Sequence, residues 1–144
     1  MTIRGRMPLF EVMEHTADIG IRSFGATRRE AFENAAMGMF SLLCDIDKVE
    51  ARLTYKVEVE ADDIETLLVE WLNELLYLHE SEGVLLKKFI VTELSERRIV
   101  GRCRGEHIDH KRHKLDADIK AATYYMLRLQ QTDRGWKAEV IFDV

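Results

Sequence analysis

The sequence predicts an α+β fold in which a largely antiparallel or mixed β-sheet is covered by two main helices. Strand candidates outnumber helix candidates, they do not alternate regularly with the helices, and the late strands are joined by short turns typical of hairpins. The chain has 144 residues, 47% of them hydrophobic and 33% charged, which is enough for one buried core. We therefore expect a single domain.

The first third of the chain predicts two strands and a helix. Short apolar segments at residues 9–13 and 19–24 indicate strands, with a polar turn between them. Thr27 and Glu30 then form a capping box, in which each side chain can accept a hydrogen bond from a backbone N–H left unpaired at a helix start. Apolar residues at helical spacing follow, so the first helix is expected over about residues 27–44.

The middle of the chain predicts a strand and a second helix. Residues 53–60 alternate between apolar and polar side chains, as in a strand with one solvated face. Asp63 can cap a helix whose apolar residues recur at i, i+3, i+4 and i+7 over about four turns. The glycine at Gly83 marks the end of this helix, which we expect over about residues 63–80.

The remaining strands are expected at residues 86–94, 98–105, 118–129 and 136–143. A turn centred near Asp133 joins the last two, and this hairpin would pair residues whose numbers sum to about 266. That register places Thr123 near Asp143, and Lys120 near Val144.

Lys120 is unusual in an otherwise apolar strand segment and needs an anionic partner. A simple ion pair with Asp143 or with the carboxylate of Val144 would meet this need. The alternative is a functional lysine that contacts a phosphate or a carboxylate on a partner.

The pair Asp143-Val144 also suggests a metal site. Two carboxylates one residue apart offer hard oxygen ligands of the kind that calcium and magnesium bind. Asp18, in the polar turn before the second strand, is a plausible third ligand. Periodicity alone does not bring Asp18 to this place.

Charge and motif content weigh against several functional classes. A net charge of -5 argues against a protein whose main task is binding phosphate backbones, so the basic residues at Arg102, Arg104 and 110–114 are most simply solvated. The histidines within residues 107–113 could bind zinc, but a flexible polar loop explains them more simply. The sequence has no phosphate-loop, H-E-x-x-H or G-x-S-x-G motif.

Cysteine use and hydropathy indicate a reducing compartment. Cys44 and Cys103 form no C-x-x-C pair and are expected to be core or half-buried thiols. No segment approaches the roughly 18 apolar residues of a membrane span. We therefore expect a cytoplasmic protein without membrane association.

Several short motifs occur in an order that resembles one known family. They are His15-Thr16-Ala17-Asp18-Ile19-Gly20, Glu30-Ala31-Phe32 with Ala35-Ala36, Glu70-Trp71-Leu72-Asn73-Glu74-Leu75-Leu76-Tyr77, Gly105-Glu106, Ile119-Lys120-Ala121 with Thr123-Tyr124, and Phe142-Asp143-Val144. In this order and at these spacings the chain resembles the archease family. The resemblance implies an archease-like domain over residues 9–144, with residues 1–8 as an N-terminal extension.

The resemblance implies an accessory protein and not an enzyme. Archeases assist the RtcB-type ligase of tRNA splicing, promoting guanylylation of a ligase histidine and multiple turnover and broadening nucleotide use, so RNA is reached only through the ligase. A divalent cation, most simply calcium, is expected at Asp18, Asp143 and Val144. Lys120 and Glu30 match further positions expected to matter for ligase activation.

The chain departs from the family pattern at Tyr125, where many relatives have histidine, and no role is assigned to this residue. Glu30 also has a complete structural explanation in the capping box. Two other functions stay open: a small metal-dependent phosphohydrolase or nuclease, and a chaperone-like module in which the metal is only a structural staple.

Overall fold

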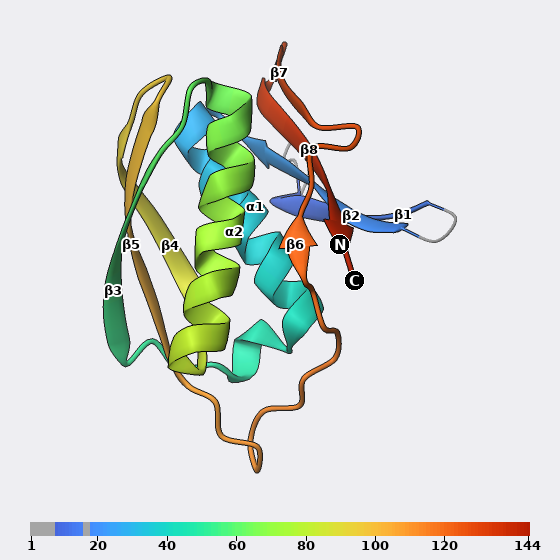
Figure 1. Cartoon of the computed structure of the whole chain (residues 1–144). Helices are drawn as coiled ribbons and strands as arrows, with labels where there is room; N and C mark the ends of the chain where they lie inside the picture. Colours follow the sequence, from blue (N-terminus) through green and yellow to red (C-terminus); the bar gives the residue numbers. More distant parts are fainter. Residues whose placement is uncertain (1–7, 16–17) are drawn as a thin grey trace.

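Two antiparallel β-sheets enclose two helices in this protein (Figure 1). The computed structural model describes residues 8–15 and 18–144, so residues 1–7 of the expected N-terminal extension lie outside the described residues. The larger sheet has the order β1-β2-β8-β6, with β7 also paired to β8, and the smaller sheet has the order β3-β5-β4. The elements are β1 (Phe10–His15), β2 (Asp18–Gly25), α1 (Arg28–Leu43), the short 3-10 helix η1 (Ile46–Lys48), β3 (Leu53–Glu60), α2 (Ile64–Glu82), β4 (Val84–Leu94), β5 (Arg98–His107), β6 (Ala121–Ala122), β7 (Arg128–Thr132) and β8 (Gly135–Asp143).

The α+β class is confirmed, and both helices lie within two residues of their expected ends. The expected single sheet is instead two sheets, because the helices are buried on more than one side. α1 packs against β2 of the larger sheet and β4 of the smaller one, and α2 packs against β6 and β3. The small side chains of Ala31, Ala35 and Ala36 in α1 are fully buried, which allows neighbours to approach closely from several directions.

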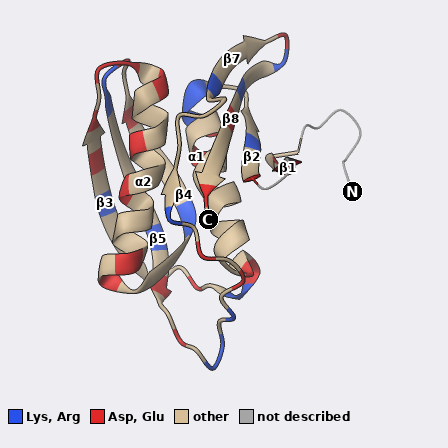
Figure 2. Ribbon diagram, turned by 45° about the vertical axis from the view of Figure 1, so that its right-hand side comes forward, with Lys and Arg blue, Asp and Glu red and all other residues tan. Residues whose placement is uncertain are grey.

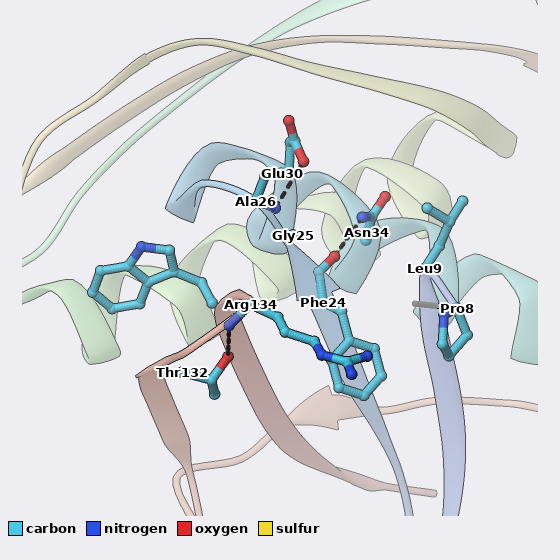
Figure 3. A pocket seen from close by; sticks show the side chains of 10 residues that line it. Pro8, Leu9, Phe24, Gly25, Ala26, Glu30, Asn34, Thr132 and Arg134 are labelled. Carbon is cyan, nitrogen blue, oxygen red and sulfur yellow. Dashed lines mark hydrogen bonds between the residues drawn. The ribbon is translucent and has the colours of Figure 1, made fainter. Parts of the chain in front are cut away.

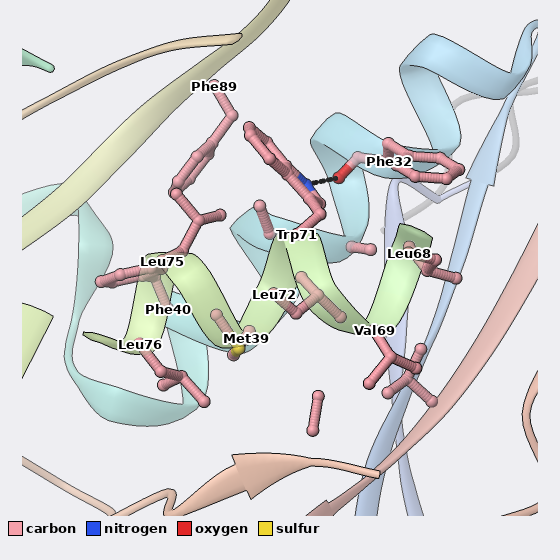
Figure 4. Close-up of a cluster of buried hydrophobic side chains, with 14 of the residues drawn as sticks. Phe32, Met39, Phe40, Leu68, Val69, Trp71, Leu72, Leu75, Leu76 and Phe89 are labelled. Atoms are coloured by element: carbon pink, nitrogen blue, oxygen red, sulfur yellow. Dashed lines mark hydrogen bonds between the residues drawn. The ribbon is translucent and has the colours of Figure 1, made fainter. Parts of the chain in front are cut away.

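The core lies between the sheets and is centred on Trp71 of α2 (Figure 4). Its indole Nε1–H donates a hydrogen bond to the main-chain oxygen of Phe32 at 3.1 Å, which ties the two helices together. The ring also lies against β5, because a Cβ added at Gly101 would be 2.7 Å from it. A glycine at this position therefore lets the strand approach the tryptophan.

The helix ends follow their predicted capping chemistry. The N–H of Glu30 donates to Thr27 Oγ1 at 3.2 Å, while the Glu30 carboxylate accepts from the N–H of Ala26 at 2.9 Å instead of that of Thr27. Asp63 caps α2, and Gly83 ends it with φ 63°, a left-handed conformation that glycine adopts without a steric penalty. No helix in the described part of the chain is long and apolar enough to cross a membrane.

The prediction of one continuous strand over residues 118–129 is wrong, because the structure has two shorter strands, β6 and β7, in this region. Ala121 pairs with Asp143, and Arg128 pairs with Glu139. Arg128 is seven residues after Ala121, but Glu139 is only four residues before Asp143, so the segment from β6 to β7 has three residues more than a continuous strand would need. The three extra residues form a loop between β6 and β7, in which Met126 has φ 53°. For this reason Ala121, and not Thr123, lies opposite Asp143.

Candidate functional site

Asp18 and Asp143 meet at one end of the larger sheet. β2 and β8 are antiparallel, and Ile19 is paired with the buried Phe142. Extending this register by one residue places Asp18 opposite Asp143, on the face of the sheet away from Phe142. Residues directly opposite each other in antiparallel strands have Cβ atoms about 4.5–5.5 Å apart. Pairing of β2 with β8 thus brings Asp18 close to the end of β8, which periodicity alone could not do.

Lys120 and Val144 lie at the same end of the sheet. β6 pairs with β8 through Ala121 and Asp143, and the N–H of Lys120 donates to the main-chain oxygen of Asp143 at 2.8 Å. The next residues along this register, Lys120 and Val144, are neighbours, as the hairpin predicts. Within the described residues the exposed Lys120 side chain has no ion-pair partner. We call Asp18, Lys120, Asp143 and Val144 the carboxylate tip.

The donor set of the carboxylate tip fits a hard divalent cation. Asp18 and Asp143 are both exposed, and neither forms an ion pair with a side chain that the structure describes. Two carboxylates opposite each other in a sheet repel, so a cation between them would relieve the repulsion. Together with the main-chain oxygen of Val144 they present only oxygen ligands, which suit calcium and magnesium. Among the described residues no three Asp, Glu, His or Cys side chains form a metal cluster, so a third protein ligand would be a main-chain oxygen.

Asn73 of α2 holds β6 in place, a role that sequence reasoning missed. Its Oδ1 accepts a hydrogen bond from the N–H of Ala122 at 2.8 Å, and its Nδ2 donates to the oxygen of Ala122 at 3.2 Å. The side chain thus occupies the edge of β6 that is not paired with β8. Asparagine is a weak helix former, so its position inside a long helix is the signal that indicates a specific partner.

The loop after β6 presents three exposed, largely apolar side chains. Tyr124, Tyr125 and Met126 are each more than half exposed. The hydroxyl of Tyr124 donates to the Glu70 carboxylate at 2.5 Å, and this bond, together with partial burial and the charge of Glu70, raises the pKa of Tyr124 to about 12. Glu70 of α2 therefore has a hydrogen-bond partner in this loop.

Glu30 lies away from the carboxylate tip, in the wall of a hollow of about 220 Å³ at the other end of β2 (Figure 3). Its carboxylate is bonded to the N–H of Ala26, just beyond that strand. β2 has eight residues, which corresponds to about 23 Å from first to last at 3.3 Å per residue. The structure therefore does not bring Glu30 together with Lys120, and the two sit at separate places.

A second polar cluster surrounds Glu106 at the end of β5. Glu106 and His113 are only 5% and 4% exposed. His113 Nδ1 accepts the N–H of Asp109 at 2.9 Å, so Nε2 carries the proton and donates to Glu106 at 3.0 Å. Burial raises the pKa of Glu106, but hydrogen bonds from the Glu50 N–H, Arg112 and His113 outweigh burial and lower it to about 2. The expectation of a flexible loop is wrong for His113, which anchors this loop to β5.

Cys44 and Cys103 are free, buried thiols, as expected. Burial raises the pKa of Cys44 to about 11 and that of Cys103 to about 12. Both thiols therefore stay protonated at neutral pH and act as small apolar side chains.

The two antiparallel sheets and the two helices between them define the class of the protein, a small α+β domain. The model of the archease protein family matches residues 10–144. The chain is 42% identical to protein archease of Methanosarcina mazei, over 94% of this chain and 95% of the relative. It is 37% identical to protein archease of Pyrococcus furiosus, over 96% of this chain and 100% of the relative. The chain belongs to the archease family, which confirms the resemblance seen in the motifs.

Two solved structures have the same fold. The solution structure of Methanobacterium thermoautotrophicum protein 1598 is 36% identical, with a TM-score of 0.81 over 96% of this chain and 100% of that one. The crystal structure of a Thermotoga maritima archease, described as a possible chaperone, has a TM-score of 0.62 over 99% of this chain and 100% of that one. The second is only 20% identical and supports the fold alone.

Proposed function

We propose that this protein is an accessory activator of an RtcB-type ligase of tRNA splicing and is not itself catalytic. It would promote guanylylation of the ligase histidine, allow multiple turnover and broaden nucleotide use, with a divalent cation, most simply calcium, at the carboxylate tip. Membership of the archease family supports the accessory role. The observation that carries the proposal is the register of β2 and β8, which, continued by one residue, puts Asp18 opposite Asp143, while the main-chain N–H of Lys120 donates to the main-chain oxygen of Asp143.

The residues of the chain would act by positioning charge. A bound calcium or magnesium ion would supply a fixed positive charge for phosphate oxygens. Lys120, exposed at the same tip, offers an ammonium group that can contact a phosphate or a ligase carboxylate. Asn73 holds the backbone from which Lys120 projects. Phosphoryl-type transfer depends mostly on such positioning and charge stabilisation.

Multiple-turnover ligation tests the proposal. An RtcB-type ligase would be supplied with RNA halves that carry a 2′,3′-cyclic phosphate and a 5′-hydroxyl, with and without this protein. We expect Asp18→Asn and Asp143→Asn to lower the stimulation of turnover by roughly tenfold or more. Asp133→Asn is the matched control, because Asp133 is exposed in the turn between β7 and β8 and is not part of the carboxylate tip. Full stimulation by both tip variants would overturn the proposal.

A hydrolysis assay without the ligase tests the alternative of a small phosphohydrolase or nuclease. The protein alone, incubated with RNA, nucleotides and a divalent cation, should show no turnover. Metal-dependent hydrolysis that disappears in Asp18→Asn would favour the enzyme.

A chaperone-like role is the second candidate, because the related Thermotoga maritima archease is described as a possible chaperone. The cation would then only staple the end of the sheet. In that case calcium removal would lower the melting temperature, while Asp143→Asn would still stimulate the ligase.

A further inference from the structure

Four cations gather on the outer face of the smaller sheet, in a protein whose net charge is -5. Lys56 on β3 is paired with Arg102 on β5, and Lys88 on β4 is paired with Arg104 on β5. Paired residues in antiparallel strands share a face, so the four side chains form one cluster about 10 Å wide across the three strands. We call Lys56, Lys88, Arg102 and Arg104 the basic face.

The basic face points away from the helices. Cys103, which lies between the two arginines, is fully buried, and the neighbouring Gly101 lies against the Trp71 ring. Side chains alternate along a strand, so Arg102 and Arg104 project from the opposite, solvent-facing side. This arrangement makes the cluster accessible to a large ligand.

The charges of the basic face are only partly neutralised. Lys56 has an ion pair with Glu58 at 2.8 Å, and Arg104 donates to a main-chain oxygen at 2.8 Å. Lys88 and Arg102 are exposed, and within the described residues neither has an ion-pair partner. The cluster therefore retains a net positive charge.

The loop after β5 carries a further exposed cation. Glu106 follows Arg104 on this face of β5, and its bonds to Arg112 and His113 anchor the loop there. Lys111 in this loop is exposed to solvent. Figure 2 shows blue segments on β3 and β5 and in this loop at the bottom of the molecule. The cations of β3, β4 and β5, which are separate in the sequence, are thus neighbours in space, and the loop adds a further cation at this end of the molecule.

We propose that the basic face binds the phosphate backbone of RNA without sequence preference. Backbone binding needs only accessible cations that displace counterions, which this face provides. A protein partner would need apolar or aromatic anchors at the centre of its interface, and Ile90 is the one exposed large apolar side chain on the described strands of this sheet. The inference does not rest on ligase activation, since it concerns the protein alone.

Fluorescence anisotropy with a labelled RNA stem-loop tests this site, with the salt concentration varied from about 50 to 200 mM. Four phosphate contacts predict that the logarithm of the association constant falls with the logarithm of salt with a slope of about -3. Arg102→Ala and Lys88→Ala should each weaken binding by about fivefold to tenfold at the lowest salt and reduce the slope by about 0.7–0.9. Matching melting curves would show that each variant is folded.

Arg98→Ala is the matched control, because Arg98 lies on the same face of β5 but contacts three carboxylates. Its guanidinium lies 3.1 Å from Glu58, 3.9 Å from Glu60 and 2.9 Å from Glu93. The control removes the same charge but no phosphate contact, so it should leave the salt slope unchanged, although the three freed carboxylates will repel RNA and lower the affinity. A salt slope reduced in Arg98→Ala as much as in Arg102→Ala would overturn the proposal. Absence of RNA binding at low salt, or tighter binding of polyglutamate than of RNA, would also overturn it.

Discussion

At the scale of single residues, Asn73 links the core to the carboxylate tip. Asn73→Ala leaves both the N–H and the oxygen of the buried Ala122 without their partner. Each such loss costs about 1–3 kcal/mol, so we expect the free energy of unfolding to fall by about 2–6 kcal/mol. Urea denaturation measures this change, and faster hydrogen exchange at the Ala122 amide would locate it.

Glu74→Ala is the control for this prediction, because Glu74 is the next residue in α2 and is exposed. Its free energy of unfolding should stay within about 0.5 kcal/mol of wild type. If Asn73→Ala were as stable as Glu74→Ala, the bonds to β6 would have no role in stability.

Glu106 should make the free energy of unfolding depend on pH in the acidic range. Its pKa of about 2 in the folded protein lies below the ordinary value of 4.5. The carboxylate therefore stabilises the fold above about pH 4.5, and this contribution is lost as the pH falls through 2. We expect the stability difference between wild type and Glu106→Gln to be largest near neutral pH and to shrink toward pH 2. A difference that stays constant in urea titrations across this range would contradict the assignment.

At the scale of elements, Gly20 sets the approach of β2 to β8. A Cβ at this position would lie 2.5 Å from the main-chain oxygen of Val140 and 2.9 Å from the Ile141 side chain. Gly20→Ala should force the two strands apart, lowering the free energy of unfolding by about 1–3 kcal/mol and weakening calcium binding at the carboxylate tip. Denaturation and calorimetric calcium titration measure the two effects.

Gly83→Ala is the control for Gly20→Ala, because it should change stability without changing calcium binding. A Cβ at Gly83 would meet nothing within 4 Å, so only its left-handed backbone is strained, at about 1–2 kcal/mol. This variant should lose stability but bind calcium as wild type does. Equal calcium affinity in the two glycine variants would show that strand spacing does not control the tip.

Local signals predicted the helices and most strands, because caps and periodicity act within a few residues. Thr27, Asp63 and Gly83 mark helix ends where the structure has them. The break between β6 and β7 was missed, because the left-handed backbone of Met126 has no glycine or asparagine to signal it. The second sheet was missed as well, since helical periodicity does not tell how many layers cover a helix.

The candidate site shows the same limit. The hairpin between β7 and β8 predicted the approach of Lys120 to the end of β8, with an error of two residues. The approach of Asp18 depends on β2–β8 pairing, which joins distant parts of the chain and leaves no local pattern. Asn73 also bonds to a residue far away in the sequence, Ala122. Predicting these bonds would have required the position of β6 beside α2.

At the scale of the whole molecule, the two proposed sites lie on different sheets. Carboxylates lie at the end of the larger sheet, and the basic face lies on the outer side of the smaller sheet. Net charge alone weighed against phosphate binding, but it carries no information on how charges are distributed. The two proposals therefore place a cation site and an RNA-binding face on different sheets of one molecule.

Calcium titration by calorimetry tests most directly that the register of β2 and β8 builds a cation site. Wild type and Asp133→Asn should bind one calcium ion with the same affinity, while Asp18→Asn and Asp143→Asn should each lose this binding. Unchanged calcium affinity in Asp18→Asn would show that Asp18 and Asp143 do not form a shared site.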